Sequence, residues 1–262
     1  MGHIFDYKDS VAYDTWYNSR YNRLAVMHQM QLLKCLLKPV AGDSVIDIGC
    51  GTGETLKNLT ACPGLDLTGI DPSPYMLDFA RKNLVDKVDL HRGVAENLPF
   101  EDNAFNHACL ILTLEYAENP RKAVEEAARV AKDRLFIGVL NRYAILNMQR
   151  RVKGIFEKSI YNNAQFFSIW ELKHIVRTVL GRVPVTWRTV NLFPPVGGPI
   201  VNRIQETTLV QKMPFGTYVG MVVTLKPRYR VKPLALRLPD KRDKRLMQGQ
   251  CTSVKEKEKP TG

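Results

Sequence analysis

The stretch "VIDIGCGTGE", Val45 to Glu54, is an apolar run that ends in three alternate glycines. Apolar runs of this length are typical of buried parallel strands, and alternate glycines let the chain turn sharply and bring backbone N–H groups close to a ligand. The residues after the turn have a helical pattern, and a helix N-terminus attracts an anionic group. Three roles follow for the turn: binding a dinucleotide pyrophosphate, binding the amino-acid end of S-adenosylmethionine, or only connecting a strand to a helix.

The spacing of the glycines argues against the dinucleotide. A dinucleotide fingerprint is G-x-G-x-x-G, whereas here the glycines are Gly49, Gly51 and Gly53, and Glu54 occupies the third fingerprint position. The carboxylate of Asp47 would be unfavourable beside a pyrophosphate but would suit an ammonium group. An amino-acid zwitterion therefore fits both the helix N-terminus and this aspartate.

Strand-like and helix-like patterns alternate on both sides of this turn, which predicts an α/β fold with a Rossmann-like, doubly wound parallel sheet. Ser168 and Glu171 have the spacing of a capping box, which predicts that a later helix begins there. The predicted helices cover residues 21–38, 54–62, 74–84, 120–131 and 168–181. The predicted strands cover residues 44–49, 66–71, 87–93, 107–114, 133–140, 185–191 and 216–225.

Length and charge predict one domain and a tail. A chain of 262 residues can bury one full-sized core, which we assign to residues 1–225 with a lid inserted at about 142–167. Residues 226–262 contain 12 Lys and Arg but 4 Asp and Glu, so they carry +8 of the net charge of +12. This segment is poor in aromatic residues and rich in charge and proline, so we predict a basic, flexible tail.

Several classes of protein are disfavoured by the sequence. No apolar run approaches the roughly 18 residues that a membrane span needs, and the first residues do not resemble a secretory signal. The five cysteines are scattered, so we expect reduced thiols and neither a disulfide framework nor a metal site. We therefore expect a cytoplasmic protein.

Several segments in order resemble class I S-adenosylmethionine-dependent methyltransferases, closest to the type 11 branch that acts on small molecules. "VIDIGCGTGE" resembles the first motif, "GIDPSPYML" (69–77) the ribose-binding segment, and "GVAENLPFEDNAFNHACLILTLEYAENP" (93–120) the adenine-binding loop and fourth strand. "VAYDTWYNSR" (11–20) resembles the aromatic N-terminal helix that closes over the cofactor. The resemblance covers about residues 10–225 and implies a seven-stranded sheet whose last strand is antiparallel.

The resemblance implies a set of cofactor-binding residues. Asp47 and the glycines of the turn would hold the methionine end of S-adenosylmethionine, and Asp71 would accept hydrogen bonds from the ribose hydroxyls, as it also would in a dinucleotide site. The residues that the resemblance assigns to the cofactor are Tyr17, Asp47, Gly49, Gly51, Gly53, Asp71, Met76, Ala95, Glu96 and Thr113. Two positions depart from the family pattern: Val94 stands where an aspartate often accepts from the adenine amino group, and Asn106 stands where an aspartate usually follows Phe105.

The sequence predicts the chemical class of the acceptor but not its identity. Methyl transfer requires a nucleophile held in line with the methyl group, and it requires a base only if the acceptor must lose a proton. Candidates for such a base or for the pocket wall are Glu115 and Tyr116 after the fourth strand, and Asn141 and Tyr143 after the fifth. The aromatic lid predicts a small, apolar or aromatic acceptor. Two alternatives are an RNA or protein methyltransferase that uses the basic tail, and a cofactor-binding protein without catalysis.

Overall fold

The computed structural model describes residues 2–84, 88–144, 147, 164–192 and 207–226. The chain divides into two compact units, residues 1–228 and residues 229–262, and all the described residues lie in the first. The predicted tail lies outside the described residues, apart from Lys226. Most of the predicted lid lies outside them too. Both stay predictions.

Seven strands form one sheet in the order β3-β2-β1-β4-β5-β7-β6. The strands are β1 (Ser44–Ile48), β2 (Asp66–Asp71), β3 (Val88–Arg92), β4 (Phe105–Ile111), β5 (Ala131–Leu140), β6 (Val185–Val190) and β7 (Tyr218–Thr224). The pairs among β1 to β5 are parallel, whereas β7 is antiparallel to both β5 and β6. The predicted fold, with seven strands and an antiparallel last strand, is confirmed.

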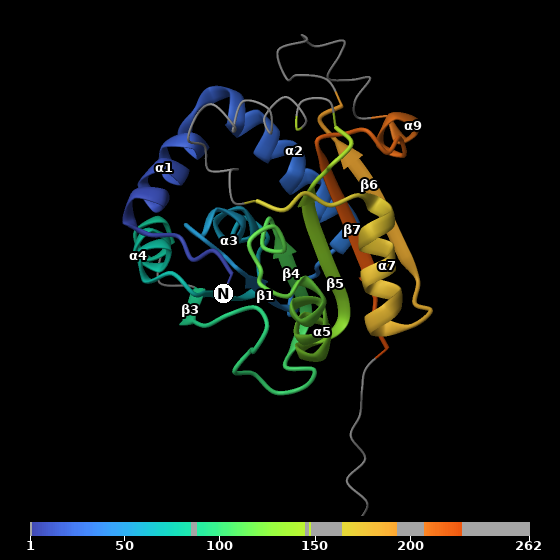
Figure 1. The fold of residues 1–262 in the computed structure, drawn as a ribbon. Helices are drawn as coiled ribbons and strands as arrows, with labels where there is room; N and C mark the ends of the chain where they lie inside the picture. Colours follow the sequence, from blue (N-terminus) through green and yellow to red (C-terminus); the bar gives the residue numbers. More distant parts are fainter. Residues whose placement is uncertain (1, 85–87, 145–146, 148–163, 193–206, 227–262) are drawn as a thin grey trace, which may run out of the picture. The chain divides into compact units, whose positions relative to one another are not determined.

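Helices cover both faces of the sheet (Figure 1). One face packs against α2 (Arg20–Leu37), α3 (Glu54–Leu59) and α4 (Pro74–Asn83), and the other against α5 (Pro120–Val130) and α7 (Ile169–Leu180). The first helix, α1 (Tyr7–Asn18), packs on α2 and α4. The short α9 (Thr208–Gln211) precedes β7. Because all the parallel strands run the same way, their carboxyl ends meet at one edge of the sheet.

Capping residues decide where the helices begin. The predicted capping box is confirmed: Ser168 Oγ accepts from Glu171 N, and Glu171 Oε2 accepts from Ser168 N. A second capping box, between Asp6 and Asp9, starts α1 at Tyr7, four residues before the segment with aromatic helix character. The structure thus extends the N-terminal helix toward the start of the chain.

Two glycines face each other where β5 meets β7. Gly138 pairs with Gly220, and each has a side chain lying over it. A Cβ atom on Gly138 would collide with the hydroxyl of Tyr218, and one on Gly220 would lie 2.7 Å from Leu32 Cδ2. The absence of these two Cβ atoms lets α2 lie directly on β7 and lets the Tyr218 ring lie on β5.

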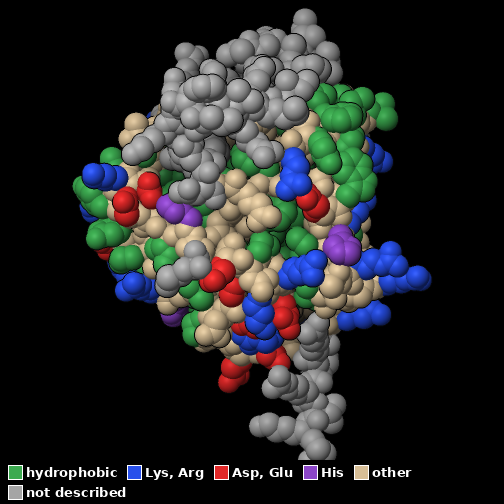
Figure 2. Space-filling model, viewed as in Figure 1, with side chains coloured by type: hydrophobic (Ala, Val, Ile, Leu, Met, Phe, Trp, Pro, Cys, Tyr) green, Lys and Arg blue, Asp and Glu red, His purple; other side chains and the backbone are tan. Residues whose placement is uncertain are grey.

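The surface combines charged and apolar regions. Exposed apolar side chains gather over and just after α9, where Leu209, Met213 and Phe215 are 80%, 45% and 54% exposed (Figure 2). Among the described residues, no helix has the length and apolarity to cross a membrane.

Candidate active site

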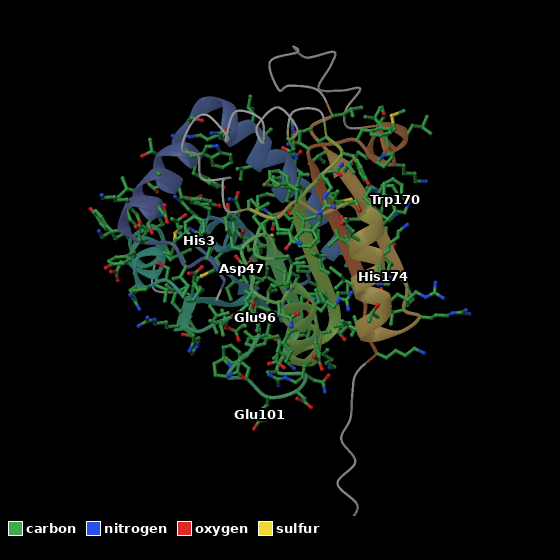
Figure 3. All side chains as sticks on the ribbon, viewed as in Figure 1. His3, Asp47, Glu96, Glu101, Trp170 and His174 are labelled. Atoms are coloured by element: carbon green, nitrogen blue, oxygen red, sulfur yellow. The ribbon has the colours of Figure 1, made fainter. Side chains whose placement is uncertain are left out.

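A cavity of about 710 Å³ lies at the carboxyl ends of the parallel strands. Its walls come from the glycine turn after β1, the end of β2, the loop after β3, the segment after β4, the N-terminal segment, and the helices α1 and α2. His3, Asp47 and Glu96 lie around this end of the sheet in Figure 3, whereas Trp170 and His174 lie along α7. Carboxyl ends of parallel strands are the usual binding edge of an α/β sheet.

The glycine turn contributes two of its three glycines to the cavity wall, Gly49 and Gly51. Gly51 has φ +53°, and no atom lies within 4 Å of where its Cβ would be. The backbone at Gly51 is therefore accessible from the cavity. A Cβ on Gly49 would lie 2.5 Å from Thr113 Cγ2, and Thr113 Oγ1 donates to Ile48 O at 2.7 Å. Thr113, which the resemblance assigns to the cofactor, also lines the cavity.

The third glycine has a different position. Gly53 does not line the cavity, and a Cβ there would lie 2.8 Å from Leu84 Cδ1 and 3.2 Å from Ala80 Cβ. The structure therefore places Gly53, which was predicted to bind the cofactor, at the contact between α3 and α4. Because the three glycines alternate evenly in the sequence, their spacing does not show that Gly53 packs against a helix while Gly49 and Gly51 line the cavity.

Asp71 is held at the end of β2 by two backbone N–H groups. Its Oδ2 accepts from Gly51 N and its Oδ1 accepts from Ser73 N, both at 2.9 Å. Burial raises the pKa of Asp71 to about 6, although these two hydrogen bonds act in the opposite direction. Each carboxylate oxygen can accept more than one hydrogen bond. Asp71, which lines the cavity, therefore keeps acceptor capacity for a pair of hydroxyls.

Asp47 lies beneath the turn and not in the cavity wall. Its side chain is almost completely buried, and its Oδ1 has no hydrogen-bond partner in the part of the chain that the structure describes. Burial and then the charge of Asp71 raise the pKa of Asp47 to about 7, against a hydrogen bond from Thr55. A buried carboxylate oxygen without a donor is unfavourable. Because Asp47 does not line the cavity, its predicted contact with the ammonium of an amino-acid ligand stays a prediction.

Two side chains of α5 hydrogen bond the loop after β3, which contributes the predicted adenine side of the site. Ala95, Glu96 and Met76 line the cavity as predicted. Glu126 Oε2 accepts from Leu98 N at 3.0 Å, and Arg129 Nη2 donates to Leu98 O at 3.0 Å. The ion pair with Arg129 lowers the pKa of Glu126, so this clamp on the loop is charged at neutral pH.

Residues 2–5 of the N-terminal segment also close the cavity, a role that the sequence did not predict. His3 N donates to Tyr116 O at 3.1 Å, Phe5 O accepts from Ser73 Oγ at 2.7 Å, and the rings of Phe5 and Tyr116 are 4.9 Å apart. Gly2, His3, Ile4 and Phe5 all line the cavity. The density of aromatic residues between Phe5 and Tyr17 was the signal that could have indicated this.

The remaining wall comes from α1 and α2. Tyr17, which the resemblance assigns to the cofactor, lines the cavity, and burial and then Glu54 raise the pKa of its hydroxyl. The pKa of Glu54 is itself raised, mainly by partial burial. The side chains that these two helices contribute to the wall are Tyr13, Trp16, Tyr17, Val26, Gln29 and Met30.

The four candidates for catalysis separate into two pairs. Glu115 and Tyr116 line the cavity, whereas Asn141 and Tyr143 do not. Asn141 Nδ2 donates to the carbonyls of Pro214 and Gly216 at 2.8 Å, so its amide joins the end of β5 to the segment before β7. Tyr143 is 48% exposed, with its ring 5.8 Å from that of Trp170.

Glu115 has an unusual environment at the end of β4. Its Oε1 accepts from Leu140 N at 2.6 Å, and within the described residues its buried Oε2 has no partner. Burial raises the pKa of Glu115 to about 8, against the hydrogen bond from Leu140. The side chain is therefore mostly protonated at pH 7.

Comparison with known proteins gives concordant matches. Residues 46–136 match the type 11 methyltransferase-domain family. An uncharacterized protein of Methanocaldococcus jannaschii is 32% identical over 176 residues, 66% of this chain and 78% of that protein. A demethylmenaquinone methyltransferase of Clavibacter sepedonicus is 34% identical over 96 residues, 36% of this chain and 39% of that enzyme.

A solved structure extends the match over the domain. It is a SAM-dependent methyltransferase of Thermotoga maritima, described as a possible histamine N-methyltransferase. Its TM-score is 0.65 at 27% identity, and the match covers 84% of this chain and 97% of that one. The glycine turn and Asp71, whose carboxylate accepts from Gly51 N and Ser73 N, fit the same cofactor. The chain belongs to the type 11 class I methyltransferases and is an S-adenosylmethionine-dependent methyltransferase.

Proposed function

We propose that the protein methylates a small, apolar or aromatic acceptor that carries no negative charge. The observation that supports this most is that one cavity of about 710 Å³ joins the cofactor residues to a wall of aromatic and aliphatic side chains from α1 and α2. Pockets for small molecules are concave, largely apolar and supplied with few polar groups. The Thermotoga maritima relative, named for a small amine, is consistent with this class of acceptor.

The charges around the cavity support the exclusion of anions. Five carboxyl groups line it; Glu115 is mostly protonated at pH 7, and the other four, Glu54, Asp71, Glu96 and Glu118, outnumber the ammonium of Lys122. A carboxylate or phosphate on the acceptor would be repelled by this wall, because charge interactions are strong where water is excluded. The same wall suits a cofactor with a positive sulfonium.

The chain's residues bind, orient and exclude water. When bound, S-adenosylmethionine supplies an activated methyl group, so the protein mainly has to hold the nucleophile in line. Asp71 and the backbone of Gly51 fix the cofactor side, and the Phe5 and Tyr116 rings close the cavity against solvent. Glu115, mostly protonated at pH 7 and bonded to Leu140 N, is suited to fixing the ends of β4 and β5. We propose that it does not take up a proton from the acceptor.

Two measurements test the function. Calorimetric titration of the full chain should give micromolar binding of S-adenosylmethionine and none of NAD. A panel of small aromatic and aliphatic amines, alcohols and acids should then yield methylated product only from members without an anionic group. Cofactor binding with no product from any acceptor would favour the non-catalytic alternative.

The basic tail supports a second candidate, an RNA or protein methyltransferase. Residues 226–262 carry a charge of +8, which is enough to attract the phosphates of a nucleic acid. This attraction weakens as the salt concentration rises. Residues 1–228 form a compact unit of their own, so a protein truncated after residue 228 should still fold. Methylation of RNA or protein that is lost on this truncation, with cofactor binding unchanged, would favour the second candidate. Turnover of a small molecule unaffected by truncation supports the first.

A further inference from the structure

Gln29 is a largely buried residue of the cavity wall whose amide forms no hydrogen bond among the described residues. It lies on the inner side of α2, is 7% exposed and lines the cavity. In the part of the chain that the structure describes, its side chain has no hydrogen-bond partner, although its helix neighbour His28 bonds to Asn191 at 2.6 Å. The amide is not among the fully buried polar groups that lack a partner, so it is accessible from the cavity and is available to hydrogen bond a ligand there.

The position of Gln29 separates it from the cofactor residues. Helix α2 packs against β5, β6 and β7, and Leu140 at the end of β5 lines the cavity with Gln29. The residues that fit the cofactor lie instead around β1 and β2, on the other side of β4 in the sheet. Gln29 is thus on the acceptor side of the cavity, between Val26 and Met30.

We propose that Gln29 determines acceptor specificity by hydrogen bonding the polar group of the acceptor, and that this group is an amine or hydroxyl on an apolar or aromatic skeleton. The inference rests on the proposed function. An amide both donates and accepts, so it can pair with either group, and the apolar skeleton would pack against Trp16, Val26 and Met30. The carboxyl groups of the wall exclude acidic versions of the same molecule.

A series of indoles that differ in one group tests the proposal. The probes are tryptamine, indole-3-ethanol, 3-ethylindole and indole-3-acetate, titrated by calorimetry into the full chain saturated with S-adenosylhomocysteine. We expect tryptamine or indole-3-ethanol to bind about tenfold more tightly than 3-ethylindole, a typical gain for a buried hydrogen bond. We expect indole-3-acetate not to bind.

Three variants assign the effect to the amide. Gln29→Leu keeps the volume but should abolish the preference for the polar probes over 3-ethylindole. Gln29→Glu should favour tryptamine over indole-3-ethanol. Gln31→Leu, an exposed glutamine on the same helix that does not line this cavity, should behave as wild type.

A stability measurement separates this role from a structural one. Since the amide has no partner, Gln29→Leu should keep or raise the melting temperature of the ligand-free protein, and S-adenosylmethionine should bind with unchanged affinity. A destabilised Gln29→Leu, or one with weakened cofactor binding, would overturn the proposal. So would failure of both polar probes to bind a wild-type protein that binds the cofactor. Failure of wild type to bind S-adenosylmethionine would instead refute the function on which the inference rests.

Discussion

The two sides of the cavity are built in different ways. On the cofactor side, backbone hydrogen bonds fix the shape of the wall: Gly51 N donates to Asp71, and Ile70 O accepts from Gly49 N and Cys50 N. On the acceptor side, side chains from α1 and α2, including Trp16 and Gln29, form the wall. Backbone geometry tolerates few substitutions, whereas a wall of side chains can change one residue at a time. A fixed cofactor site can therefore serve different acceptors.

The largest expected effect separates two glycines of the same turn. Gly49→Ala should lower the free energy of unfolding by about 3 kcal/mol, because Gly49 has φ +75° and Thr113 occupies the space for a Cβ. Gly51→Ala should lower it by only about 1 kcal/mol, because space is available, yet should weaken S-adenosylmethionine binding. Chemical denaturation and calorimetry measure both quantities. Equal destabilisation by the two variants would contradict this account.

The next effect concerns the cofactor side alone. Asp71→Ala should weaken S-adenosylmethionine binding by about 100-fold, since it removes two acceptors and releases Gly51 N and Ser73 N. Asp66→Ala, at the exposed start of the same strand, is the control. Calorimetry gives both affinities. If Asp71→Ala binds as tightly as the control, the ribose assignment is wrong.

The next prediction concerns Glu115, between the two sides of the cavity, and how it makes protein stability depend on pH. Burial raises its pKa from 4.5 to about 8, so folding takes up a proton between these values, and Glu115 makes the protein less stable as the pH rises through this window. Glu115→Gln mimics the protonated form and should be more stable than wild type by about 2 kcal/mol at pH 9, but not at pH 4. Urea denaturation across pH measures this. A pH-independent difference would contradict the raised pKa.

The smallest effect is expected for one hydroxyl on α1. Tyr17→Phe should weaken S-adenosylmethionine binding about fivefold, the loss of one hydrogen bond, if the Tyr17 hydroxyl reaches the cofactor carboxylate. Tyr7→Phe on the same helix, with a 60% exposed ring, is the matched control. If Tyr17→Phe changes acceptor binding and not cofactor binding, Tyr17 belongs to the other side of the cavity.

The sequence predicted the fold because the fold depends on local, contiguous signals, and the cofactor residues, which stay predictions, come from motifs in the same segments. Alternating patterns predicted parallel strands joined by helices, and Asp71 was singled out by its place at the end of a strand. The acceptor side could not be predicted in this way. Gln29 sits in a helix whose apolar spacing indicates only packing, and nothing in the sequence shows that one polar residue of that face meets a cavity. Asn141 shows the opposite case: it is a polar residue beside a strand end, and its side chain bonds to the backbone of Pro214, Gly216 and Tyr143 instead of lining the cavity.

The packing of Gly138 and Gly220 has a consequence for the evolution of the family. The Tyr218 hydroxyl fills the space of a Cβ on Gly138, and Leu32 fills that of a Cβ on Gly220. A relative can therefore acquire a side chain at position 138 only together with a smaller residue at 218, and at position 220 only with a shorter one at 32. These pairs should covary across homologues, and departures from the pattern should mark enzymes whose α2, and with it the acceptor wall, stands farther from the sheet.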